Sequence, residues 1–211
     1  MDVRFDFLWA LGAAVIAFAL SAIFGRVLIP YLHKLKFGQT ILDIGPSWHK
    51  NKQGTPTMGG ILFMCGVTVS MALVLITDRV MGSDIVAGDS LVPGNVKAKL
   101  YSGIIMAFAY ALIGFVDDYI KVVKKINLGL TIFEKSIAQI LVMGGYLFSL
   151  HMAGATYMFV PFLGNIDLGI FFWILGPVVM YCTVNAVNFT DGIDGLCSSV
   201  TAVAVLFLSV L

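Results

Sequence analysis

Four aspartates are the residues most able to do chemistry, because they lie at the ends of long apolar runs. Asp117 and Asp118 are adjacent, and Asp191 and Asp194 are three residues apart, in a chain with 12 acidic residues among 211. An aspartate at a bilayer centre costs about 2.5–3.5 kcal/mol, so acids near spans lie at the water boundary, are paired, or serve a function. Repulsion between neighbouring acids raises one pKa unless a divalent cation or a lysine stabilises both charges. The pattern indicates a site for a cation or a polar substrate.

The first pair closes an apolar run in the segment Gly114 to Lys121. Adjacent side chains on a helix are about 100° apart, so spacing alone does not make Asp117 and Asp118 a facing pair. One could bind a metal while the other acts as a base. The alternative is a charged helix end with ordinary i,i+3 or i,i+4 ion pairs to Lys121 and Lys124. Acids near a helix C-terminus oppose the macrodipole, which weakens that alternative slightly.

The second pair lies in a polar segment, Asn185 to Gly195, between two apolar runs. Asp191 or Thr190 suits the N-cap of a following helix. Capping explains one acid but not both, because Asp191 and Asp194 at i,i+3 would lie close on one helical turn. Carboxylates with amide donors suit a sugar nucleotide, a magnesium ion, or both.

A third polar segment, Gly45 to Gly60, collects Gly, Pro, Thr, Lys and His before an apolar run. Backbone N–H groups at such a helix start favour an anion. The segment is not a Walker P-loop, because the GK[ST] order is absent. The alternative is an ordinary turn with snorkelling lysines, and His49 by itself is more typical of a solvated loop.

Composition predicts that a membrane positions these segments. The chain is 59% hydrophobic and 12% charged, with a mean hydropathy of +0.97, which excludes a soluble domain and a disordered chain. The net charge of +1 argues against a nucleic-acid partner. Cys65, Cys182 and Cys197 lie in apolar segments without CxxC spacing, so we expect small buried hydrophobic residues rather than a disulfide or zinc site.

The apolar runs predict an all-α, polytopic transmembrane helical bundle. A span needs about 20 mostly apolar residues, and the runs are Phe7 to Leu32, Thr57 to Thr77, Leu100 to Val116, Leu130 to His151, Gly169 to Val187, and a sixth from Leu196. The sixth is still apolar at Leu211. We therefore expect residues 1–211 to form a single membrane domain, about six spans in all, truncated inside the sixth span.

Positive charges predict the orientation. Four lysines lie between the first two runs and four at the end of the third run and the start of the fourth, namely Lys34, Lys36, Lys50, Lys52, Lys121, Lys124, Lys125 and Lys135. The connection from His151 to Gly169 has no Lys or Arg. The bias places the amino terminus outside and all three polar segments at the cytoplasmic face.

Three runs, KNKQGTPTMGG, GFVDDYIKV and NAVNFTDGIDGL, occur in this order at these positions. Together they resemble the phospho-N-acetylmuramoyl-pentapeptide transferase family, from about Phe24 to the last residue. The resemblance implies a bacterial inner-membrane enzyme with ten spans that uses Mg²⁺. Such an enzyme moves phospho-N-acetylmuramoyl-pentapeptide from its UDP carrier to undecaprenyl phosphate, forming lipid I and UMP in peptidoglycan synthesis. Family members also resemble dimers, so a homodimer is expected.

The resemblance assigns roles by position. Asp117 is the candidate base, Asp118 and Asp194 complete the catalytic group, and Asp118 with Asp191 is the candidate metal pair. The remaining expected residues bind substrate: His49, Lys52, Thr57, Asn188 and Asp191. Phe189 and Ile193 stand where the family commonly has Leu, and both changes are apolar.

Other functions stay open, and the length departs from the family. Family members continue for about as many spans again, with another metal-binding Asp and a His-rich loop, so we expect residues 1–211 alone neither to bind Mg²⁺ tightly nor to transfer phosphosugar. A polyprenyl-phosphate N-acetylglucosamine-1-phosphate transferase would share the same paired-aspartate chemistry. A transporter would bury its acids at the midplane between broken helices. A purely structural scaffold would tolerate Asp117→Asn without loss of turnover.

Overall fold

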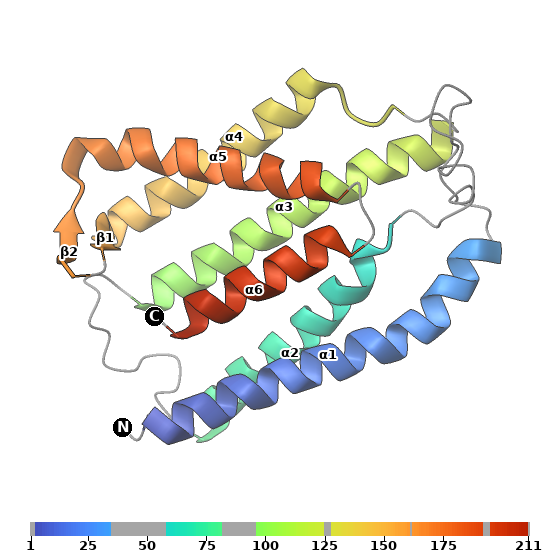
Figure 1. The fold of residues 1–211 in the computed structure, drawn as a ribbon, viewed down its shortest axis with the longest axis horizontal. Helices are drawn as coiled ribbons and strands as arrows, with labels where there is room; N and C mark the ends of the chain where they lie inside the picture. Colours follow the sequence, from blue (N-terminus) through green and yellow to red (C-terminus); the bar gives the residue numbers. More distant parts are fainter. Residues whose placement is uncertain are drawn as a thin grey trace.

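Six α-helices form from the apolar runs, because a helix satisfies its own backbone hydrogen bonds where no water is available. The computed structural model describes residues 3–34, 58–81, 96–124, 128–160, 162–191 and 195–210. Within them the helices are α1 (Val3–Lys34), α2 (Gly60–Met81), α3 (Val96–Lys124), α4 (Ile132–Met152), α5 (Phe172–Thr190) and α6 (Leu196–Val210) (Figure 1). Each predicted run corresponds to one helix, which confirms the all-α polytopic membrane class.

Four of these helical segments are long and apolar enough to cross a membrane: Leu8–Lys34, Gly60–Val80, Val96–Lys124 and Gly169–Thr190. Helix α4 is similar in length, with 21 residues, but it carries Glu134, Lys135, Gln139 and His151. Helix α6 is apolar and shorter. The protein is therefore a membrane protein.

Successive helices alternate in direction, so polar segments that are distant in sequence meet at one end of the bundle. The ends of α1, α3 and α5 lie at the same end as the starts of α2, α4 and α6 (Figure 1). The opposite end carries an antiparallel hairpin of β1 (Tyr157–Val160) and β2 (Gly164–Asp167), followed by the 3₁₀ turn η2 (Gly169–Phe171). The hairpin was not predicted from sequence, where residues 151–169 were treated only as a connection.

Small residues allow α1 and α2 to pack closely. Ser70 is buried and donates its hydroxyl to the Ala13 carbonyl at 2.6 Å. A Cβ at Gly66 would contact the Ser21 hydroxyl and lie 2.7 Å from the Ala17 carbonyl oxygen. Close backbone approach through small residues is typical of helix pairs in membranes.

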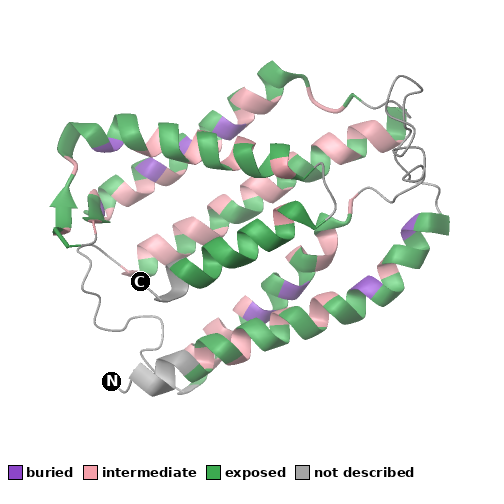
Figure 2. Ribbon diagram, viewed as in Figure 1, coloured by how far each residue is buried: buried purple, intermediate pink, exposed green. Residues whose placement is uncertain are grey.

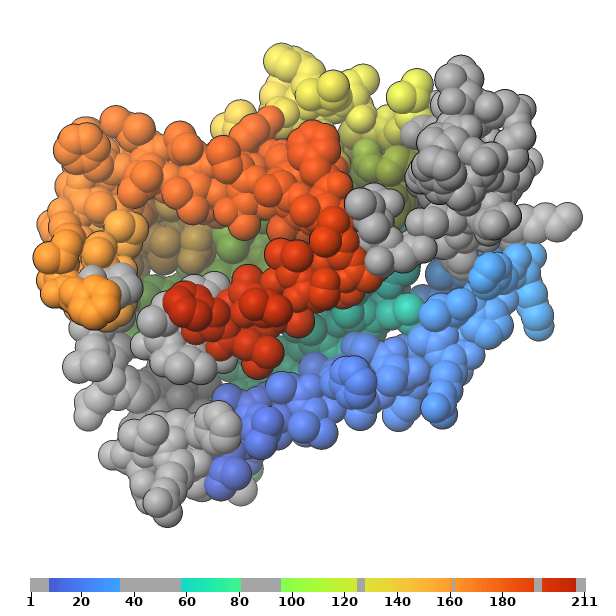
Figure 3. Space-filling model, in the orientation of Figure 1, coloured from blue at the N-terminus to red at the C-terminus, as the bar shows by residue number. Residues whose placement is uncertain are grey.

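The best-packed core lies between α4 and α5, where Met143, Leu147 and Phe172 are buried together. Figure 2 shows few buried positions and many exposed ones along the helices. Figure 3 shows α1 and α6 each presenting a long surface on the viewed face. These exposed apolar sides suit lipid contact.

The expectation for the cysteines was wrong for two of the three. Cys65 and Cys182 are exposed on their helices, and Cys197 is half-buried with its thiol 3.9 Å from the Val187 carbonyl oxygen. The reason is that a small residue in an apolar run can equally face lipid, because the surrounding medium is as apolar as a protein core.

Candidate functional site

The aspartate pair lies near the end of α3, where α2 and α4 begin (Figure 1). The Lys121 ammonium is 2.6 Å from Asp117 Oδ2 and 3.1 Å from Asp118 Oδ1. The side chain of Asp117 is 13% exposed and that of Asp118 is 34% exposed. Two adjacent carboxylates therefore converge on one cation, although their spacing alone does not make them face each other. The i,i+3 and i,i+4 ion pairs expected of a charged helix end are present for Lys121.

The other two carboxylate oxygens hold neighbouring segments against α3. Asp117 Oδ1 accepts the Leu130 backbone N–H at 2.9 Å, just before α4 begins. Asp118 Oδ2 accepts the Met58 backbone N–H at 3.2 Å, just before α2 begins. Each aspartate thus links the end of α3 to the start of another helix as well as to Lys121.

Met58 itself has an unusual backbone conformation. Its φ is 69°, in the left-handed region that residues other than glycine rarely adopt. Such conformations cost of the order of 1–3 kcal/mol and cluster at functional sites. The strained residue belongs to the predicted anion-binding segment, so the Asp118 bond joins two of the three sequence motifs.

The third motif meets α4 rather than the aspartate pair in the described contacts. Asn188, on the last turn of α5, accepts a hydrogen bond from the Lys135 ammonium at 3.2 Å. Asp191 is the C-cap residue of α5. This brings a lysine cation and an amide together at the same end of the bundle as Asp117 and Asp118.

The alternative in which Thr190 or Asp191 caps α6 does not fit the structure. Thr190 is the last residue of α5 and donates its hydroxyl to the Val187 carbonyl at 2.9 Å. Helix α6 begins at Leu196, directly after Gly195, which has a φ of +78°. Asp191 is therefore too far along the chain from α6 to cap it.

Several predicted site residues are not located by the structure. His49, Lys52, Thr57 and Asp194 lie outside the described residues. Among the residues that are described, no group of three His, Cys, Asp or Glu side chains gathers as a metal cluster. The predicted metal pair of Asp118 and Asp191 consequently remains a prediction.

Two lysines were not recognised as site residues from sequence. Lys121 could have been found, because its i,i+3 and i,i+4 spacing to the aspartates was visible as an ordinary ion-pair pattern. Lys135 could not, because its partner Asn188 is 53 residues away and belongs to another helix. Lys121 had been considered as an ordinary helix-end ion-pair partner and as an orienting charge, and Lys135 only as a charge that orients the chain in the membrane.

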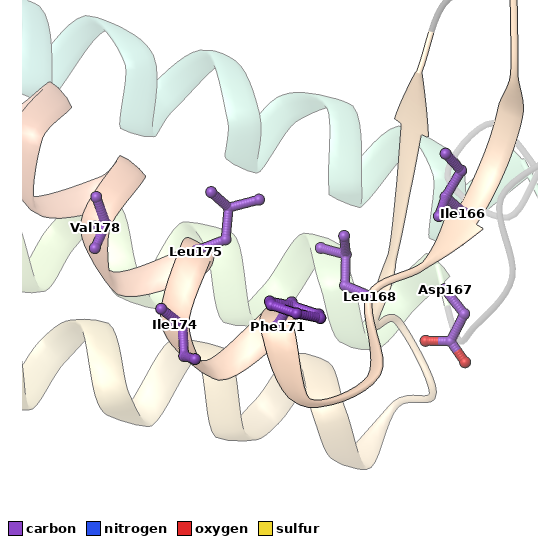
Figure 4. Close-up of a pocket in the computed structure, with 7 residues that line it drawn as sticks. All are labelled: Ile166, Asp167, Leu168, Phe171, Ile174, Leu175 and Val178. Atoms are coloured by element: carbon purple, nitrogen blue, oxygen red, sulfur yellow. The ribbon is translucent and has the colours of Figure 1, made fainter.

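A hollow at the opposite end of the bundle has a different character. Figure 4 shows its lining from β2 through the start of α5, namely Ile166, Asp167, Leu168, Phe171, Ile174, Leu175 and Val178. Its one acidic side chain, Asp167, accepts hydrogen bonds from the Thr156 hydroxyl and the Gly169 N–H, both at 3.1 Å. These two bonds use the Asp167 carboxylate to hold the segments on either side of the hairpin together. The hollow therefore offers no chemistry comparable to that of the aspartate pair.

Two sequence patterns of known families match the chain. The pattern of glycosyl transferase family 4 matches residues 100–211, over half of the chain and including both aspartate motifs. Signature 1 of phospho-N-acetylmuramoyl-pentapeptide-transferase matches residues 52–64, which include Met58.

Named relatives agree with these patterns. The chain is 39% identical over 203 residues to a phospho-N-acetylmuramoyl-pentapeptide-transferase of Clostridium botulinum (strain Alaska E43), covering 95% of this chain and 56% of the relative. It is 39% identical over 193 residues to the protein of the same name from Bacillus mycoides, covering 90% of this chain and 55% of the relative. The chain thus spans about half the length of these relatives. No solved structure matches it.

Proposed function

The chain belongs to glycosyl transferase family 4, and from this we propose that the protein transfers phospho-N-acetylmuramoyl-pentapeptide from its UDP carrier to undecaprenyl phosphate. The products are lipid I and UMP, in peptidoglycan synthesis. The names of the relatives support this choice of sugar. The protein would act in the bacterial inner membrane, with its amino terminus outside and its site facing the cytoplasm, as the lysine distribution favours.

One observation carries the proposal. The hydrogen bond from Met58 N–H to Asp118 Oδ2 joins the segment that matches the transferase signature to the aspartate pair, across 60 residues of sequence. A nucleotide-binding segment and a cation-binding pair must be adjacent for pyrophosphate chemistry, because the reacting groups are all anions.

The aspartate pair fits a divalent cation in donor type. Carboxylate oxygens are the ligands that Mg²⁺ prefers, and the Lys121 ammonium already receives one oxygen from each aspartate. We infer that Asp118, with Asp117 beside it and Asp191 from the α5 end, would hold the ion. Bound Mg²⁺ would offset the charge of the pyrophosphate and help to fix in-line geometry.

The remaining roles belong to this chain's own side chains. Asp117 would accept the proton of the lipid phosphate that attacks the sugar nucleotide, and Asp194 would complete the catalytic group. The soluble substrate would be held by His49, Lys52, Thr57, Asn188 and Asp191. Lys52 would hold the pyrophosphate as a point charge, a common use of lysine.

Reconstitution tests the proposal directly. The protein expressed from its native gene is purified in detergent and given undecaprenyl phosphate, Mg²⁺ and a fluorescent UDP-N-acetylmuramoyl-pentapeptide. We expect lipid I and UMP, with loss of product in Asp117→Asn and Asp118→Asn. Asp167→Asn is the matched control, because its carboxylate closes the hairpin at the opposite end of the bundle.

Two results would contradict the proposal. Product formed only from UDP-N-acetylglucosamine would assign the protein to the other sugar. Equal turnover in wild type, Asp117→Asn and Asp118→Asn would remove the aspartate pair from the chemistry altogether.

A further inference from the structure

A ladder of polar side chains runs from the site end of the bundle into the interface between α4 and α5. Ser136 and Tyr181 share a hydrogen bond between their hydroxyls at 2.9 Å. The Asn185 amide donates to Gln139 Oε1 at 3.2 Å, and because α4 and α5 run in opposite directions (Figure 1) this bond crosses the Ser136–Tyr181 bond. With the Lys135 to Asn188 bond, three rungs connect these two helices.

The rungs occupy one face of each helix. On α4, Gln139 is three residues from Ser136 and four from Lys135, and on α5, Asn185 is four residues from Tyr181 and three from Asn188; these spacings place the side chains close together on a helix. The ladder therefore sets both the rotation and the axial register of α5 against α4.

Gln139 is the central member of this ladder because it also connects to α3. It is only 3% exposed. Its backbone carbonyl accepts the Tyr110 hydroxyl of α3 at 3.2 Å, while its side chain accepts from Asn185 of α5. One buried residue thus joins the helix that carries Asp117 and Asp118 to the helix that ends at Asn188 and Asp191.

Breaking the Gln139–Asn185 hydrogen bond would leave buried amide groups without their partner. A buried polar group without a partner is costly, so one arrangement that pairs the amides is favoured over rotated or shifted ones. Hydrogen bonds between transmembrane helices are individually modest. Their loss would change where α5 lies more than whether the bundle folds.

We propose that the Gln139–Asn185 bridge is a positioning device, which holds the end of α5 at a set distance from the aspartate pair on α3. Its kinetic consequence rests on the proposed function, since the two helix ends would carry different parts of one site. Gln139 would act through Asn185 and α5, without touching substrate.

A distance measurement tests the geometry without any assay of activity. In the protein expressed from its native gene, with its cysteines replaced by alanine, spin labels are placed at Val123 on α3 and Phe189 on α5, both exposed. Pulsed electron paramagnetic resonance then compares wild type with Gln139→Leu. We expect a broader or shifted distance distribution in the variant.

Kinetics provide the second readout. We expect Gln139→Leu to lower kcat/KM for the UDP-sugar by about tenfold or more, because the displaced end of α5 carries Asn188 and Asp191 and small misplacements far from the chemistry can cost that much. Asn185→Ala removes the same bond from the α5 side and should reproduce both effects, which also covers poor folding of Gln139→Leu. Ser70→Ala is the matched control, since it removes an equally buried hydrogen bond between α1 and α2.

The outcomes separate the two proposals. Unchanged distance distributions in Gln139→Leu and Asn185→Ala would overturn the positioning role, even if thermal stability fell. An inactive wild-type protein whose distance distribution still broadens in both variants would support the bridge and count against the proposed function alone.

Discussion

Lys121 is the residue on which the aspartate pair converges. Without a cation between them, two adjacent carboxylates repel each other, and this repulsion destabilises the doubly charged form. The ammonium group removes that cost by pairing with Asp117 and Asp118 together. A divalent cation at the same place would have to displace it or share the oxygens with it.

Replacing Lys121 with methionine should therefore increase the stabilisation that Mg²⁺ provides. A ligand that binds only the folded state raises its stability, and the variant lacks the competing ammonium. We expect saturating Mg²⁺ to raise the Tm of Lys121→Met more than that of wild type, by about 2–4 °C for each extra kcal/mol. Differential scanning fluorimetry measures this, with Lys135→Met as control. Equal shifts in wild type and Lys121→Met would contradict the idea that Lys121 occupies the cation position.

Gly129 is the second residue with a local role, because it lies against the Asp117 side chain. A Cβ there would lie 2.7 Å from Asp117 Cγ and 2.8 Å from the Asp117 carbonyl oxygen. Both distances are too short for a real side chain, and one of the two atoms belongs to the backbone. The absence of a side chain at Gly129 allows Leu130 N–H to reach the carboxylate.

Gly129→Ala should therefore displace Asp117 and lower turnover by about tenfold or more. The measurement is kcat for lipid I formation, with the circular dichroism spectrum checked for unchanged helix content. Gly144→Ala on α4 is the control, because a Cβ there meets nothing within 4 Å. If the two alanine variants turned over equally fast, the close approach at Gly129 would have no functional meaning.

At the scale of elements, the start of α4 is held by a capping box. The Glu134 N–H donates to the Thr131 hydroxyl at 3.2 Å, and the Thr131 N–H donates to Glu134 Oε2 at 2.8 Å. The box lies next to Leu130, whose N–H bonds Asp117. The cap therefore determines where the backbone donor to the aspartate pair is presented.

Thr131→Val should loosen this turn by about 1 kcal/mol, the usual cost of losing an N-cap. Hydrogen exchange followed by mass spectrometry should show faster exchange in peptides that begin α4, with α1 peptides unchanged. Thr131→Ser keeps a hydroxyl acceptor and should exchange like wild type. Identical protection in Thr131→Val and Thr131→Ser would show that the box contributes nothing there.

At the scale of the whole molecule, the packing of α1 on α2 meets the site only at the start of α2, through the Met58 to Asp118 bond, among the described contacts. Helix α2 contacts α1 extensively and α3 less so, while α4 contacts both α3 and α5. Stability and catalytic geometry therefore depend on different interfaces. Substitutions at the α1–α2 interface should affect stability more than catalytic geometry.

Gly66→Ala tests this separation. The added Cβ would meet the Ala17 carbonyl at 2.7 Å, so the helices must move apart, and overpacking typically costs 1–3 kcal/mol. We expect a lower Tm and an unchanged kcat below the new transition. Gly103→Ala on α3, where a Cβ meets nothing within 4 Å, should leave both values near wild type. A loss of kcat without loss of Tm in Gly66→Ala would show that the interfaces are coupled.

Hydropathy and spacing were enough to predict six helices and the membrane class, because a span must be long, apolar and helical whatever it packs against. The family followed from the resemblance of three short motifs. The same reasoning found Asp117 and Asp118, and the ordinary helix spacing already contained the Lys121 ion pairs. These properties depend on residues close together in sequence.

Tertiary structure decided what joins those residues. The Met58 to Asp118 bond, the Lys135 to Asn188 bond and the Gln139 to Asn185 bridge link positions 46–60 residues apart. They depend on the rotation and register of each helix, which neighbouring helices set and hydropathy does not. The exposure of Cys65 and Cys182 escaped prediction because an apolar residue in a membrane protein can face either outward or into the core.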